Sequence, residues 1–90
     1  MAGSSRDQLA RAMAQLDVCL KTAVAGGYDR HASVMDMDIR RRFGWALELW
    51  EEVLSSSPQS GDVAGLCDFH DRFLDATTHL EVAALKEVGE

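Results

Sequence analysis

Residues 39–54, IRRRFGWALELWEEVL, decide the fold of this chain. They hold both tryptophans, and their apolar residues recur at the three- and four-residue steps of an α-helix. One broad face collects the larger apolar set, which is Met35, Ile39, Phe43, Ala46, Leu47, Trp50, Val53 and Leu54. We therefore expect this face to be the centre of a small core.

A smaller apolar set points nearly the opposite way on the same helix. Relative to Phe43, the residues Trp45 and Leu49 lie across the helical wheel, and Val34 falls near them. Tryptophan is enriched at protein interfaces, so we interpret Trp45, Leu49 and Val34 as a partner-binding patch. The alternative is that another helix of the same chain covers this side.

The rest of the chain continues the helical pattern. Hydrophobic residues make up 47% of it, there is one proline, and most other residues favour helix, so we predict an all-α fold. An apolar stripe from Leu9 ends at Gly26-Gly27, which suits a helix C-cap, and a Ser/Pro/Gly cluster over 55–61 precedes the third stripe. We predict helices at about 5–25, 30–55 and 62–88. Residues 1–90 then form a single domain, an elongated up-down-up antiparallel three-helix bundle.

The expected N-caps differ in how well the sequence defines them. Ser4 or Ser5 suits the first helix, and Asp62 suits the third. The second start is uncertain by several residues, with Asp29 or Ser33 as its cap. With few aromatic residues the core of one copy is thin, so we expect a homodimer formed through uncovered apolar surface.

The net charge of −6 disfavours binding to nucleic acid and to anionic membranes. Most of this charge falls in the last third of the chain, where Asp68, Asp71 and Asp75 share one side of the third helix with His79. We interpret the three aspartates as an acidic face that steers a basic partner. A metal site there would need a second cluster of ligands, and the sequence offers none, so we expect no metal.

Nothing in the sequence predicts catalysis. Cys19 and Cys67 are too few for a disulfide framework, and we expect both to be small core residues of a cytoplasmic protein without signal peptide or membrane span. His70 falls on the apolar stripe, which indicates a core histidine. A nucleophile would need a histidine beside it in a cleft, so we expect a protein that is not an enzyme and binds no cofactor.

The turn after the first helix carries a family resemblance. The chain resembles the FliT-type flagellar type III export chaperones, first at Leu20, Ala23, Ala25, Gly27, Tyr28 and Asp29. A long charged helix, the break at 55–61 and an amphipathic third helix complete the resemblance. The resemblance implies an all-α cytoplasmic protein that shields an aggregation-prone segment of an export substrate, classically the filament-cap protein. Two alternatives stay open: a dimeric helical adaptor or regulator of a bacterial or phage operon, and, more remotely, a metal-binding helical protein.

Overall fold

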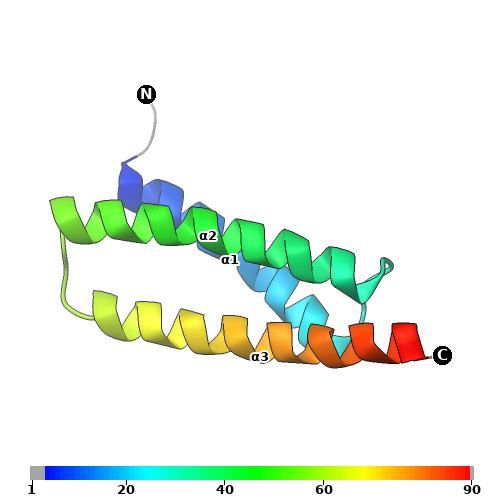
Figure 1. The fold of residues 1–90 in the computed structure, drawn as a ribbon. Helices are drawn as coiled ribbons and strands as arrows, with labels where there is room; N and C mark the ends of the chain where they lie inside the picture. The colour runs from blue at the N-terminus through cyan, green and yellow to red at the C-terminus, as the bar shows by residue number, and fades with distance from the viewer. Residues whose placement is uncertain (1–3, 90) are drawn as a thin grey trace.

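The computed structural model describes residues 4–89, and within this range the chain forms three α-helices and no strand (Figure 1). The helices are α1 (Ser5–Ala25), α2 (Ala32–Ser56) and α3 (Asp62–Gly89). Each helix contacts the other two, and the molecule measures 49 × 27 × 17 Å along its principal axes. The prediction of an elongated all-α protein is confirmed, and the helix bounds agree with the predicted ones to within two residues at every end.

The ends of α1 follow the sequence signals. Ser4 is the N-cap, and its hydroxyl accepts a hydrogen bond from the backbone N–H of Asp7. Gly26 ends the helix in the left-handed region, with φ at 77°, where a residue with a β-carbon would be strained. Both predictions for this helix are confirmed.

The N-caps of α2 and α3 differ from the predicted ones. His31 is the N-cap position of α2 and makes no side-chain capping bond, so neither Asp29 nor Ser33 is the cap. The N–H of Ala32 instead donates to the Glu87 carboxylate of α3 at 2.9 Å. This long-range hydrogen bond satisfies one of the first backbone N–H groups of α2, as a local cap would. Asp62 is the first residue of α3 and not its cap.

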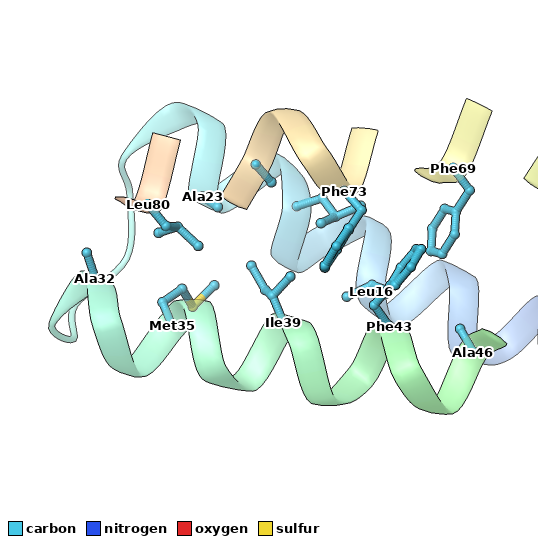
Figure 2. Packing of buried hydrophobic residues seen from close by; sticks show 12 residues of the cluster. Leu16, Ala23, Ala32, Met35, Ile39, Phe43, Ala46, Phe69, Phe73 and Leu80 are labelled. Atoms are coloured by element: carbon cyan, nitrogen blue, oxygen red, sulfur yellow. The ribbon is translucent and has the colours of Figure 1, made fainter. Parts of the chain in front are cut away.

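Most of the core lies between all three helices (Figure 2). Its centre is aromatic: the rings of Phe43 on α2 and Phe73 on α3 stack with centroids 3.9 Å apart, and Phe69 lies 5.6 Å from Phe43. The buried members are Leu16, Leu20, Ala23, Ala32, Met35, Ile39, Phe43, Ala46, Phe69, Phe73, Ala76 and Leu80. A second cluster, Leu9, Leu49, Trp50 and Val53, joins α1 to the last turns of α2. The predicted core face of α2 is confirmed except at Leu47, which is exposed, and Leu54, which is only partly buried.

Ion pairs join the helices at their edges. Arg6 of α1 binds Asp62 at the start of α3, where its hydrogen bond and that of the Gln59 N–H lower the pKa of the Asp62 carboxyl. Arg72 of α3 binds Asp17 of α1. Both pairs join residues far apart in the chain, and they fix how the helices meet. Over the described residues, none of the helices has an apolar stretch long enough to span a bilayer.

Candidate functional site

Trp45 and Leu49 lie one helical turn apart on α2 but in opposite surroundings. Trp45 is 57% exposed, whereas Leu49 is 4% exposed and packs in the cluster that contains Leu9 of α1. The prediction that Leu49 shares an outward patch with Trp45 is therefore wrong. The physical reason is that α1 packs against a second side of α2, so the buried arc of α2 is wider than its main apolar face. This agrees with the alternative that another helix of the same chain covers this side.

Trp45 instead belongs to an exposed row along the outer side of α2. Val34, Met37, Arg41 and Trp45 recur at steps of three and four residues, and all four side chains are exposed. The structure therefore keeps Val34 with Trp45 on one side of the helix. Met37, at 71% exposed, is the third apolar residue on this side of α2, in place of the predicted Leu49.

A depression between α1 and α2 opens beside Trp45. Arg11 on α1 and Arg42 and Trp45 on α2 are among the residues that line it. Within residues 4–89, Arg11 forms no ion pair. We define the tryptophan surface as this row and its neighbouring arginines, which are Arg11, Val34, Met37, Arg41, Arg42 and Trp45.

Asp38 holds the arginines of this surface in place. Its carboxylate accepts hydrogen bonds from Arg41 at 2.9 Å and from Arg42 at 3.1 Å, and Arg30 lies 3.7 Å away. Partial burial opposes ionisation of Asp38, but the hydrogen bonds from Arg42 and Arg41 outweigh it, so its pKa is lowered. One carboxylate thus faces three guanidinium groups, which leaves a local excess of positive charge.

A second depression lies between α2 and α3. We define the α2–α3 groove by its four lining residues, which are Leu47, Leu66, Cys67 and His70. In Figure 1, α1 lies behind the pair formed by α2 and α3, so one flank of this pair has no third helix. The predictions that Leu47, Cys67 and His70 are core residues are wrong, because each is exposed on this uncovered flank.

The groove is apolar inside and acidic at its edges. The ring of His70 lies 5.9 Å from that of buried Phe43, so the aromatic core reaches the surface there. Glu51 on α2 follows Leu47 by one helical turn, and Asp71 on α3 follows Cys67 by one turn, so each helix carries an exposed carboxylate one turn from the groove lining. Over the described part of the chain, neither carboxylate has an ion-pair partner.

The predicted acidic face of α3 is exposed, and one of its three carboxylates pairs with an arginine. Asp68 pairs with Arg72 at 3.5 Å, and Asp75 lies 3.6 Å from the imidazole of His79. Asp71 alone of the three has no such partner within residues 4–89. In the same range, no three side chains of His, Cys, Asp or Glu lie close enough together to hold a metal ion.

Cys67 and His70 line the same depression, and they are the pair that nucleophilic catalysis would use. Among the described residues no hydrogen bond joins the thiol to the imidazole, and no carboxylate orients the His70 ring. This arrangement gives no support to a catalytic role. The chain matches no protein-family model, and no curated protein or solved structure matches it.

Proposed function

We propose that this protein is a protein-binding module that shields an apolar helical segment of a partner in the α2–α3 groove. The observation that carries the proposal is the uncovered flank, where α2 and α3 each present apolar side chains without a third helix. Leu54 and Leu74 continue the apolar rows along the two helices. Grooves of this kind bind the apolar face of an amphipathic helix.

The edges of the groove favour a basic partner. Glu51 and Asp71 stand on its two sides, and Asp68 and Asp75 add negative charge further around α3. A helix with Lys or Arg beside its apolar face would neutralise Glu51 and Asp71 on binding. Such charges raise the association rate and set specificity more than they add affinity, while Leu47 and Leu66 supply the apolar contact.

Shielding of an apolar segment is also what the resemblance to the FliT-type export chaperones implies. We accordingly propose a cytoplasmic, up-down-up bundle that is not an enzyme and needs no cofactor, with an export substrate as its partner. Contacts at the ends support the up-down-up path. Arg6 at the start of α1 binds Asp62 at the start of α3 and the carbonyl of Ser57 after α2, whereas Glu87 near the end of α3 binds Ala32 at the start of α2.

Homodimerisation is a second part of the proposal. When no partner is bound, two copies of the chain would meet through their α2–α3 flanks, and this contact would cover the exposed Leu47 of both copies. That contact brings Glu51 and Asp71 of both copies together, so the dimer should be weak and strengthened by salt. Light scattering should then give a mass near twice 9.9 kDa only at high concentration, and a bound basic helix should return it to one copy.

The test is capture of the natural partner with Leu47→Glu and a matched control, Val18→Glu. Both changes place a carboxylate at an exposed apolar residue, and Val18 lies on α1 outside the groove. We expect affinity purification from the native host to recover one partner with the wild type and with Val18→Glu, and to lose it with Leu47→Glu. A photo-crosslinker on Cys67, in a Cys19→Ser background, should join that same partner to the groove.

The identity of the captured protein separates the two candidate functions. A flagellar or type III export component supports the chaperone, whereas a single unrelated protein favours the dimeric adaptor. Full capture by Leu47→Glu, with an unchanged melting temperature, would contradict the groove as the binding site.

A further inference from the structure

The tryptophan surface is basic on a protein whose net charge is −6. Arg30, Arg41 and Arg42 share the single carboxylate of Asp38, and Arg11 has no ion-pair partner within residues 4–89. A guanidinium has five N–H donors, so most donors on this surface remain free for another acceptor. Beside them Trp45 exposes more than half of its surface.

We propose that the tryptophan surface is a second docking site, which binds an acidic amphipathic helix of a protein partner independently of the α2–α3 groove. Trp45 and Met37 contact the apolar residues of that helix. Arg11, Arg41 and Arg42 bind its carboxylates, for which the planar guanidinium gives a bidentate fit. Tryptophan and arginine are also the residues most enriched where interface energy concentrates.

The same charges exclude the other occupants. In a symmetric dimer formed through this surface, the arginines of one copy would face those of the other and repel them. A nucleic acid would meet Glu48 and Glu52, which follow Trp45 by one and two helical turns on the same side of α2. A nucleic acid carries a negative charge at every nucleotide, whereas a partner helix can place its carboxylates opposite the three arginines alone.

The experiment uses two synthetic 18-residue amphipathic helices that share one leucine row and differ only in flanking Glu or Lys. Trp50→Phe leaves Trp45 as the sole tryptophan, and the change removes no hydrogen bond within residues 4–89, where the Trp50 indole N–H has no partner. We expect the Glu peptide to shift the Trp45 emission to shorter wavelength and the Lys peptide to leave it unchanged. Anisotropy of labelled peptides with the wild-type protein gives the affinities without that substitution.

Two charge reversals decide the outcome. Arg42→Glu should weaken binding of the Glu peptide by about tenfold or more. The matched control, Lys86→Glu on α3, and the groove variant Leu47→Glu should leave its affinity within about twofold of the wild type. Equal binding by Arg42→Glu and the wild type, or equal binding of both peptides, overturns the proposal. Displacement of the Glu peptide by a single-stranded oligonucleotide at lower concentration than unlabelled Glu peptide also overturns it, in favour of nucleic acid.

Discussion

The α2–α3 groove and the tryptophan surface lie on the same helix and present opposite chemistry. The groove is bordered by Glu51 and Asp71, neither of which has an ion-pair partner within residues 4–89. The tryptophan surface gathers arginines around the single carboxylate of Asp38. The net charge of −6 therefore agrees in sign with the groove but not with the tryptophan surface, so a partner chosen from the net charge alone would fit only the groove.

The two surfaces also differ in how much of the core lies under them. Phe43 and Phe73 stack beside the ring of His70, so the groove continues the aromatic core on the flank that has no third helix. Trp45 stands beside α1 but has no ring contact with the aromatic cluster. Substitutions in the groove should thus affect stability only when they reach its floor, and substitutions at Trp45 hardly at all.

The largest effect should come from the groove floor. Phe43→Ala removes a 5% exposed ring from the stack and should lower the free energy of unfolding by about 3–5 kcal/mol. Chemical denaturation followed by circular dichroism measures it. A loss below about 1 kcal/mol would mean that the aromatic stack is not the centre of the core.

The pair Leu49 and Trp45 gives the next largest difference. Leu49→Ala should cost about 2–4 kcal/mol, because Leu49 is buried against α1. Trp45→Ala should stay within about 0.5 kcal/mol of the wild type, since its side chain is mostly in water. Equal losses for the two variants would show that Trp45 is also part of the core.

The sequence predicted the three helices because their apolar stripes, glycine C-cap and Ser/Pro/Gly break are local signals. It could not place Leu49 or Leu47, because the helical wheel gives the direction of a side chain but not which neighbouring helix lies there. Leu49 is buried by α1 and Leu47 is left open by the lack of a third helix on its flank. Arg11 was missed because it reaches this surface from another helix, whereas Met37 lies in the same helical row as Val34 and Trp45 and was visible in the spacing.

Acid should remove the stabilisation that Asp38 gives to the tryptophan surface. The lowered pKa of Asp38 means that its stabilisation is fully present above about pH 3.9, the unfolded value, and is lost as the pH falls through the lower folded value. Thermal melts between pH 7 and pH 2.5 should show a smaller acid loss for Asp38→Asn than for the wild type. Identical losses would show that Asp38 contributes nothing to acid stability.

Salt should produce the smallest difference and separate the two surfaces. The screening length falls from about 10 Å at 0.1 M to about 3 Å at 1 M salt, so binding that depends on exposed charges weakens. We expect the acidic peptide to lose more affinity at the tryptophan surface than the basic peptide loses at the groove, where Leu47 and Leu66 supply apolar contact. Titrations at the two salt concentrations measure both losses, and a greater loss at the groove would reverse the comparison.

The most direct test of the central claim, that α2 carries two separate partner surfaces, is a titration with one reporter on each. A fluorophore on Cys67, in a Cys19→Ser background, reports on the groove, and Trp45 in the Trp50→Phe variant reports on the other surface. We expect the basic peptide to change only the Cys67 signal and the acidic peptide to change only the Trp45 signal, and each peptide to bind equally well when the other is present. A peptide that changes both signals, or competition between the two peptides, would contradict that claim.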